Sequence, residues 1–305
     1  MNKPARDPAL RHDPAVADSA DQLRQALAHV RALVIDIDGV LVLAGQAIPG
    51  AVDGLAELDR RGIPWRILTN TSTATRPVLS ERMAGYGLAI PPERITTSLS
   101  AAAAYTAAHH PGEPLFVIAA PAALPEFEGQ RLMAAKEADQ PGARAGAVVI
   151  GDGGDDLSYR NLNRAFRLVR RGAALLAMHR NAWWLTEQGE TFDIGGYVVG
   201  LEFATGVRAI VTGKPSPLVF RQAAADLVAE LERATPGRAA HRTEVAMVGD
   251  DVQKDILASR RAGLRSILVL SGNDGAAELR AASRGRERVA SAVATSFAAA
   301  VAALS

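Results

Sequence analysis

Two aspartates, one residue apart, stand in a strongly apolar run of the chain: residues 34–42 read VIDIDGVLV. An ionised carboxylate in a buried strand costs several kcal/mol unless a compensating group lies beside it. The pair Asp36 and Asp38 therefore predicts a cation at the end of this strand, and Gly39 allows the chain to turn tightly there.

Polar residues also follow three further apolar runs of strand length. In an open parallel sheet, ligands bind outside the carboxyl ends of the strands, so we expect these residues to gather with the aspartate pair. They are Thr69 and Asn70 after 63–68, Lys214 after 207–211, and Asp250, Asp251 and, one turn later, Asp255 after 245–248.

This set of residue types suits a divalent cation and a phosphate group together. Mg²⁺ prefers oxygen ligands, commonly one or two carboxylates, which Asp36 and Asp250 can supply. Thr69 and Asn70 can cradle phosphate oxygens, and the ammonium group of Lys214 can offset the remaining negative charge. The chain holds only four lysines against 30 arginines, so a lysine after Gly213 indicates that a compact point charge is needed.

The aspartate pair can divide the work of phosphoryl transfer. Asp36 would attack phosphorus and form an aspartyl-phosphate, which splits one difficult displacement into two easier ones. Asp38 would protonate the leaving oxygen and then accept a proton from the hydrolytic water. That role requires the pKa of Asp38 to be raised while Asp36 stays ionised beside the metal.

Composition limits the class of protein around these residues. A chain of 305 residues can form two domains, and 48% hydrophobic with 22% charged residues is typical of a soluble globular protein. A net charge of +1 gives no bulk attraction to nucleic acid or to an acidic membrane surface. The chain has no cysteine and no apolar run long enough to span a bilayer, so we expect a cytoplasmic protein without nucleic-acid or membrane partners.

Short apolar runs alternate with helical patterns along the chain. This alternation predicts an α/β fold with a doubly wound, mostly parallel, Rossmann-like sheet. The expected strands are 32–37, 63–68, 147–150, 207–211, 245–248 and 266–270, and the expected helices include 22–30, 52–61, 218–232 and a final one at 291–304.

Four stretches resemble, in order and spacing, the motifs of haloacid dehalogenase (HAD) superfamily phosphatases. They are Asp36-Ile-Asp-Gly-Val-Leu41, Leu68-Thr-Asn70, Gly213-Lys-Pro-Ser216, and Gly249-Asp-Asp251 with Asp255. The long insert between the second and third motifs resembles the α/β cap of subclass IIA. The C-terminal part of this insert is similar to the corresponding part of the cap in the phospholysine phosphohistidine inorganic pyrophosphate phosphatase group.

The resemblance implies a role for each motif residue. Asp36 is then the nucleophile, Asp38 the acid and base, Thr69 and Asn70 the phosphate clamp, and Lys214 the anchor of phosphate and nucleophile. Asp36, the backbone carbonyl of Asp38 and Asp250 would bind Mg²⁺, while Asp251 and Asp255 would orient the lysine and the metal's water ligands. The expected division is a mobile arm (1–20), a HAD core (21–97 and 205–305) and an inserted cap (98–204).

The cap sequence leaves several readings open. Residues 151–156, GDGGDD, can be a ligand loop, although a strand-to-helix turn explains them better. Trp183 and Trp184 can line a pocket for an aromatic leaving group, although a position in the core of the cap is favoured. His179, Arg180 and Asn181 follow the apolar run 173–178 and are candidate specificity residues.

The expected function is a Mg²⁺-dependent phosphatase of small phosphorylated metabolites, with the cap closing over the site. A phosphorylation-dependent signalling or phosphate-binding module is the alternative, because receiver domains also combine aspartates, Mg²⁺ and a lysine. A receiver needs only about 120 residues in one flavodoxin-like domain, however, and more than 140 residues separate Asn70 from Lys214. A homodimer formed through the cap is a further expectation from the resemblance.

Overall fold

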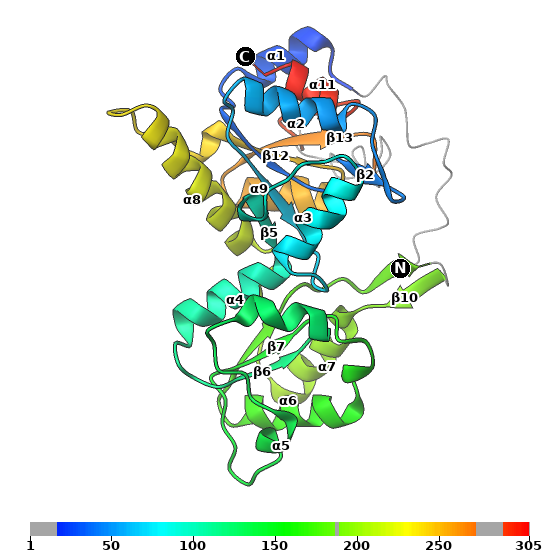
Figure 1. The fold of residues 1–305 in the computed structure, drawn as a ribbon, viewed down its shortest axis with the longest axis vertical. Coiled ribbons are helices and arrows are strands. Elements are labelled where there is room, and N and C mark those ends of the chain that lie inside the picture. Colours follow the sequence, from blue (N-terminus) through cyan, green and yellow to red (C-terminus); the bar gives the residue numbers. More distant parts are fainter. Residues whose placement is uncertain (1–16, 187–188, 273–288, 305) are drawn as a thin grey trace. The chain divides into compact units, whose positions relative to one another are not determined.

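The computed structural model describes residues 17–186, 189–272 and 289–304 (Figure 1). They form two compact units. The first unit comprises residues 1–69, 80–96 and 220–305, and the second comprises 70–79 and 97–219. Most of the expected N-terminal arm, 1–16, lies outside the described residues, and the first helix begins at Ala20.

The first unit is built on a six-stranded sheet in the order β14-β13-β12-β1-β4-β5. Strand β1 pairs in parallel with both β12 and β4, and β13 pairs in parallel with β12 and β14. In sheet order the strands are β14 (Ala292–Ala294), β13 (Arg265–Val269), β12 (Val245–Gly249), β1 (Ala32–Ile35), β4 (Trp65–Thr69) and β5 (Ile95–Thr97). Every residue of β1 and β12 is buried, which explains why these strands are continuous apolar runs.

Helices accompany this sheet, and those that lie between successive strands provide the crossovers that parallel pairing requires. They are α1 (Ala20–Leu27), α2 (Ala51–Arg60), α3 (Arg76–Gly85), α8 (Pro217–Ala234), α9 (Ala258–Arg261) and α11 (Phe297–Ala302), with short helical turns η3 (Pro92–Arg94), η6 (Arg242–Glu244) and η7 (Val252–Leu257). Helices α2 and α11 pack against each other, and Gly54 leaves room for the Phe297 ring. A small antiparallel hairpin, β2 (Val42–Leu43) and β3 (Gln46–Ala47), follows the aspartate pair.

The second unit contains a four-stranded parallel sheet in the order β11-β8-β7-β6 and a separate hairpin, β9-β10. The strands are β6 (Leu115–Ile118), β7 (Ala147–Ile150), β8 (Ala174–Ala177), β9 (Trp183–Thr186), β10 (Gly189–Phe192) and β11 (Ile210–Val211). The helices are α4 (Ser98–His109), α5 (Ala135–Ala138), α6 (Tyr159–Arg170) and α7 (Ile194–Thr205), with turns η4 (Pro121–Phe127) and η5 (Gly154–Asp156).

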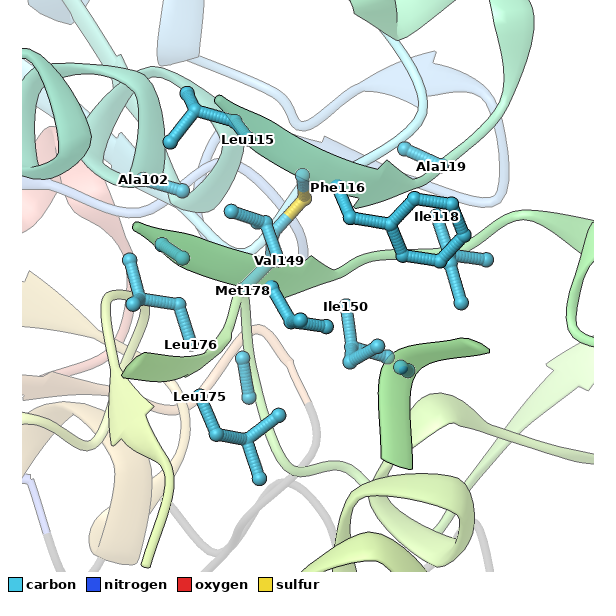
Figure 2. Close-up of a cluster of buried hydrophobic side chains, with 14 of the residues drawn as sticks. Ala102, Leu115, Phe116, Ile118, Ala119, Val149, Ile150, Leu175, Leu176 and Met178 are labelled. Atoms are coloured by element: carbon cyan, nitrogen blue, oxygen red, sulfur yellow. The ribbon is translucent and has the colours of Figure 1, made fainter. Parts of the chain in front are cut away.

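Aliphatic side chains of β6, β7 and β8 form the core of the second unit (Figure 2). Val149 and Leu176 are fully buried there, together with Ala102 from α4. Truncating one such leucine to alanine costs about 2–5 kcal/mol, so this unit has a substantial core of its own.

The α/β fold with its mostly parallel, Rossmann-like sheet is confirmed. The expected strand 207–211 is shorter, however: β11 has two residues and pairs with β8 of the second unit. The backbone N–H groups of Val207 and Ala209 donate to the side chains of Thr205 and Glu202, so a strand ladder cannot include them.

The expected final helix 291–304 is also wrong in part. Its first residues form strand β14, which pairs with β13, and helix α11 begins only after Ser296. The Ser296 hydroxyl accepts a hydrogen bond from the N–H of Ala299, so this serine caps the helix and separates the two elements.

Candidate active site

Three buried carboxylates come together at the carboxyl ends of β1 and β12. Asp36 follows β1, Asp250 follows β12, and Asp255 lies in η7. One carboxylate oxygen from each lies within 4.8 Å of the others. Because like charges repel strongly in a buried setting, such a group needs a compensating cation.

The sheet register places Asp36 beside the end of β12. Ile35 pairs with Val248, and the N–H of Asp36 donates to the Val248 carbonyl at 3.0 Å. The carboxylate of Asp36 also accepts a hydrogen bond from the N–H of Ile37 at 2.8 Å. The nucleophile predicted from the sequence is therefore held by two fixed contacts within its own unit.

Asp38 is in a different environment from Asp36. It is exposed and lies in the tight turn 37–42, where Gly39 has a φ of +76° and the Leu41 and Val42 N–H groups donate to the Ile37 carbonyl.

Glycines keep side chains away from the carboxylates. A Cβ atom at Gly39 or at Gly272 would overlap the Asp250 carboxylate, and one at Gly249 would overlap Asp255. The three carboxylates supply only hard oxygen donors, at a spacing and burial that fit Mg²⁺ or another hard divalent cation.

Asp251 and Asp255 shape the start of η7, which is a π-helical turn. The Asp251 carboxylate accepts hydrogen bonds from the N–H groups of Gln253 and Lys254 and lies 3.4 Å from the Lys254 ammonium group. The N–H of Asp251 in turn donates to the Asp255 carboxylate at 3.2 Å. Asp251 therefore caps the element that carries Asp255, and π-helical turns are frequent at functional sites.

A second group of candidate residues lies in the second unit, around the loop that follows β11. Lys214 is buried there, and its backbone makes two hydrogen bonds with the side-chain amide of Asn70. The Lys214 N–H donates to Asn70 Oδ1 at 2.7 Å, and Asn70 Nδ2 donates to the Lys214 carbonyl at 2.9 Å. The amide thus pairs with the lysine backbone as a neighbouring strand would.

Hydroxyl groups support this pairing from both sides. The Ser98 hydroxyl contacts the carbonyls of Asn70 and Thr71 at 2.9 and 3.0 Å, and the Thr212 hydroxyl donates to the Ser98 carbonyl at 3.1 Å. A side chain at Gly213 would meet Asn70 Oδ1 at 2.6 Å, so glycine is required beside the lysine. Thr69 directly precedes Asn70 and is buried at the end of β4.

His179 is buried between Ser72 and Asp193, neither of which is among the site residues expected from the sequence. Its Nε2 lies 3.4 Å from the Ser72 hydroxyl, and its Nδ1 lies 3.9 Å from the Asp193 carboxylate. Both neighbours are buried, and Asp193 also caps α7 by accepting from the Ile194 N–H. A helix-cap signal at Asp193 is visible in the sequence, but its approach to His179 depends on tertiary structure.

Of the other two specificity candidates, Arg180 has its side chain in a structural contact, whereas Asn181 contributes backbone contacts. Arg180 forms an ion pair with the buried Glu202 at 2.8 Å, and the Asn181 carbonyl accepts from the Gly195 N–H at 3.0 Å. Trp183 is half exposed, so the favoured place in the cap core is wrong for it. The side chain of Trp184 lies outside the described residues.

The glycine-rich stretch 151–156 forms a turn after β7. Asp152 Oδ1 accepts from the Gly154 N–H at 3.3 Å, and a side chain at Gly151 would meet the Met178 sulfur at 2.5 Å. These contacts agree with the turn reading.

The chain is similar to known hydrolases over most of its length. Residues 33–132 match the family model of haloacid dehalogenase-like hydrolases, and 211–298 match a HAD-hydrolase-like model. Phospholysine phosphohistidine inorganic pyrophosphate phosphatase of Xenopus laevis is 31% identical over 80% of this chain and 84% of its own. Haloacid dehalogenase-like hydrolase domain-containing protein 2 of Bos taurus is 32% identical over 82% of this chain and 87% of its own.

Among solved structures, the p-nitrophenyl phosphatase of Archaeoglobus fulgidus matches with a TM-score of 0.77 at 25% identity. The match covers 90% of this chain and 99% of that one. The sequence motifs, the parallel fold and the strand-end carboxylates agree with these similarities. The chain belongs to the haloacid dehalogenase-like hydrolases and is a phosphatase of their subclass IIA type.

Proposed function

We propose that this phosphatase is Mg²⁺-dependent and hydrolyses small phosphorylated metabolites through an aspartyl-phosphate intermediate. The observation that carries the proposal is the buried carboxylate group Asp36, Asp250 and Asp255. Its charge and its oxygen donors call for a divalent cation, and phosphoryl transfer is the reaction that such a cation and a strand-end aspartate serve together.

Asp36, Asp250 and the backbone carbonyl of Asp38 would hold the ion, with Asp255 orienting its water ligands. The close packing of Asp255 against Asp36 and Asp250 makes it a further candidate for direct coordination. When bound, Mg²⁺ supplies positive charge that neutralises the developing charge on the phosphoryl oxygens.

Asp36 and Asp38 would carry out the bond-making steps. An Asp36 oxygen attacks phosphorus, the bond from phosphorus to the leaving oxygen breaks, and Asp38 gives that oxygen its proton. Water then attacks phosphorus, Asp38 takes up the water's proton, and the carboxylate of Asp36 is released with inorganic phosphate. The exposed position of Asp38 lets it exchange protons with solvent between turnovers.

Thr69 and Lys214 would contact the transferred phosphoryl group, the lysine by its ammonium charge. The sequence assigned Asn70 to the phosphate clamp, but we assign it mainly to the positioning of Lys214. Both polar atoms of the Asn70 amide form hydrogen bonds with the Lys214 backbone. Asn70 would fix the lysine in place, and His179 with Ser72 would contact the leaving group.

The domain division and the assembly also belong to the proposal. We infer a cap of residues 98–204 on a core of 21–97 and 205–305. A homodimer through the cap is supported by α7, whose outer face presents Val199 and Phe203 to solvent, the latter 92% exposed. A large apolar side chain this exposed is typical of a contact surface.

The decisive test is Mg²⁺-dependent phosphate release from a panel of phosphomonoesters and pyrophosphate, with Asp36→Asn run beside the wild type. Turnover by the wild type alone, lost in the presence of a chelator, is the expected result. A phosphoenzyme that persists for minutes without turnover would instead support the signalling alternative. Equal release by Asp36→Asn would exclude Asp36 as the nucleophile.

A further inference from the structure

A basic cavity opens at the amino-terminal edge of the six-stranded sheet, opposite the carboxylate group. Its volume is about 370 Å³, and three arginines, two histidines, a threonine and a glutamate line it. Arg31 precedes β1, Glu244 precedes β12 and Arg265 opens β13, which are neighbouring strands. Asp36 follows the other end of β1, so about 17 Å of strand separates Asp36 from Arg31.

One of the three arginines is neutralised inside the cavity. Arg238 forms an ion pair with the buried Glu244. Burial raises the pKa of Glu244, but the hydrogen bonds from the Arg238 side chain and the His241 backbone outweigh it and leave the pKa below its ordinary value. Glu244 is therefore ionised at neutral pH, and among the described residues it is the only carboxylate in the lining.

The other two arginines form no ion pair with a carboxylate among the described residues. Arg265 donates to the carbonyls of Thr243 and Ala26 at 3.0 and 3.4 Å, which fixes its position without neutralising it. The Arg31 guanidinium forms no hydrogen bond or ion pair with any described residue; only the backbone N–H of Arg31 is used, by the Glu244 carbonyl. Two uncompensated guanidinium groups thus face one cavity in a chain whose net charge is only +1.

The lining selects among anions. Guanidinium groups bind phosphate oxygens through paired N–H donors, and His29 and His241 can add donors. The volume exceeds that of a single phosphate and falls within the range of small-molecule sites. Among the described residues that line the cavity there is no aliphatic side chain and no Phe, Tyr or Trp, so an apolar body would find no partner there.

We propose that this cavity is a second anion site, which binds a small, multiply charged phosphate compound of the pyrophosphate type. Such an anion would join the amino ends of β1, β12 and β13 through Arg31, Arg238 and Arg265. Because these strands form the middle of the sheet, occupancy would stabilise the first unit and raise its unfolding temperature.

Arg31 suits the test because its side chain is exposed and forms no hydrogen bond or ion pair with another described residue that a substitution would break. Pyrophosphate would be titrated calorimetrically into the full chain carrying Lys214→Ala, in chelator and without Mg²⁺, so that the proposed catalytic site is disabled. The same titration would be repeated with Arg31→Ala and Arg31→Glu added, and with Arg60→Ala as the control. Arg60 lies in the same unit but outside the cavity and pairs with Glu57 on the surface.

We expect one pyrophosphate per chain, weakened about tenfold by Arg31→Ala, abolished by Arg31→Glu and unchanged by Arg60→Ala. Affinity should also fall as salt is added, since the contacts are ionic. No binding at millimolar pyrophosphate, or binding that survives Arg31→Glu, would overturn the proposal. Because the readout is binding by an inactivated variant, it is independent of whether the wild type turns over any phosphate ester.

Discussion

The side-chain amide of Asn70 makes two hydrogen bonds with the backbone of a single residue, Lys214, which is 144 positions away in the chain. These hydrogen bonds fix the backbone position of Lys214 and do not involve its ammonium group. Removing it should therefore move the ammonium group without changing its chemistry.

We predict that Asn70→Ala lowers kcat/KM by about 10- to 100-fold, the range seen when a group that orients a functional residue is lost. In the background of Lys214→Ala, the same substitution should have little further effect, because the residue it positions is already gone. Steady-state kinetics of the two single variants and the double variant measure this coupling.

Asn163→Ala is the matched control, because the only described partner of the Asn163 amide is the Tyr159 carbonyl one turn back in α6. Its kcat/KM should equal that of the wild type. If the effects of Asn70→Ala and Lys214→Ala simply add, Asn70 contacts the substrate by itself and the positioning role is wrong.

A substitution at Gly249 tests the carboxylate group without touching a carboxylate. Because a Cβ atom there would overlap Asp255, we predict that Gly249→Ala displaces Asp255 and weakens Mg²⁺ binding. Titration calorimetry with Mg²⁺ should show at least about a tenfold weaker affinity, the lower end for a disturbed metal environment. Gly85→Ala is the control, since nothing lies within 4 Å of a Cβ at that position; equal affinities of the two variants would contradict the prediction.

The sequence identified single residues best where local order decides their place. Asp36 and Asp250 could be predicted because each follows a buried strand, and neighbouring parallel strands bring their carboxyl ends together. The pairing of Asn70 with the lysine backbone and the approach of Ser72 to His179 could not, because each joins distant segments through side-chain geometry.

At the scale of elements, the sequence-based prediction is wrong in part for the strand 207–211 and for the final helix 291–304. Residues 207–211 have the composition of a strand, but the N–H groups of Val207 and Ala209 are taken by side chains of α7. The alanine-rich tail favours helix by propensity, yet Val293 lies in β14 beside β13. Tertiary contacts override local preference in both cases.

An ion pair ties α6 to the turn after α5 in the second unit. The Arg164 guanidinium donates to both oxygens of Asp139, at 2.9 and 2.5 Å, and these hydrogen bonds hold the pKa of Asp139 below its ordinary value. A carboxyl group whose pKa is lowered by folding stabilises the folded state above its unfolded-state pKa. That stabilisation is lost as the pH falls through the lower, folded-state value.

We therefore predict that Asp139→Asn is less stable than the wild type at pH 7 and that the difference shrinks as the pH falls below about 4. Urea unfolding at a series of pH values measures it. Asp152→Asn provides the control, since Asp152 accepts a hydrogen bond from the Gly154 N–H but forms no ion pair with any described residue. A difference that is constant with pH would show that the lost contact is not ionic.

At the scale of the molecule, the sequence predicted an α/β core with a mostly parallel sheet and an inserted α/β cap. The described residues form two compact units, and each contains a parallel sheet of its own. The alternation of apolar runs and helical patterns carries that information, because each strand of a parallel sheet requires a crossover. No helix within the described ranges is long and apolar enough to span a membrane. Which faces stay exposed depends on packing, and the sequence alone does not reveal it.

The outer face of α7 is the place to test assembly. Val199 and Phe203 lie four residues apart and therefore on one side of the helix, and Gly200 between them leaves open space that a partner helix can approach closely. A charge in the middle of such an apolar contact would be desolvated without a partner, which is strongly unfavourable. If the cap forms a homodimer through this face, Phe203→Glu should produce a monomer.

Tyr159→Glu is the matched control, because Tyr159 is also a highly exposed aromatic residue, on α6 of the same unit. Light scattering after size exclusion should give a dimer for the wild type and Tyr159→Glu, and a monomer for Phe203→Glu with its circular dichroism unchanged. A dimer that survives Phe203→Glu would place the interface elsewhere. A wild type that is monomeric at all accessible concentrations would exclude a dimer contact for Phe203. Dimerisation depends on protein concentration, so a dimer formed through this face must appear as a molar mass that rises with concentration.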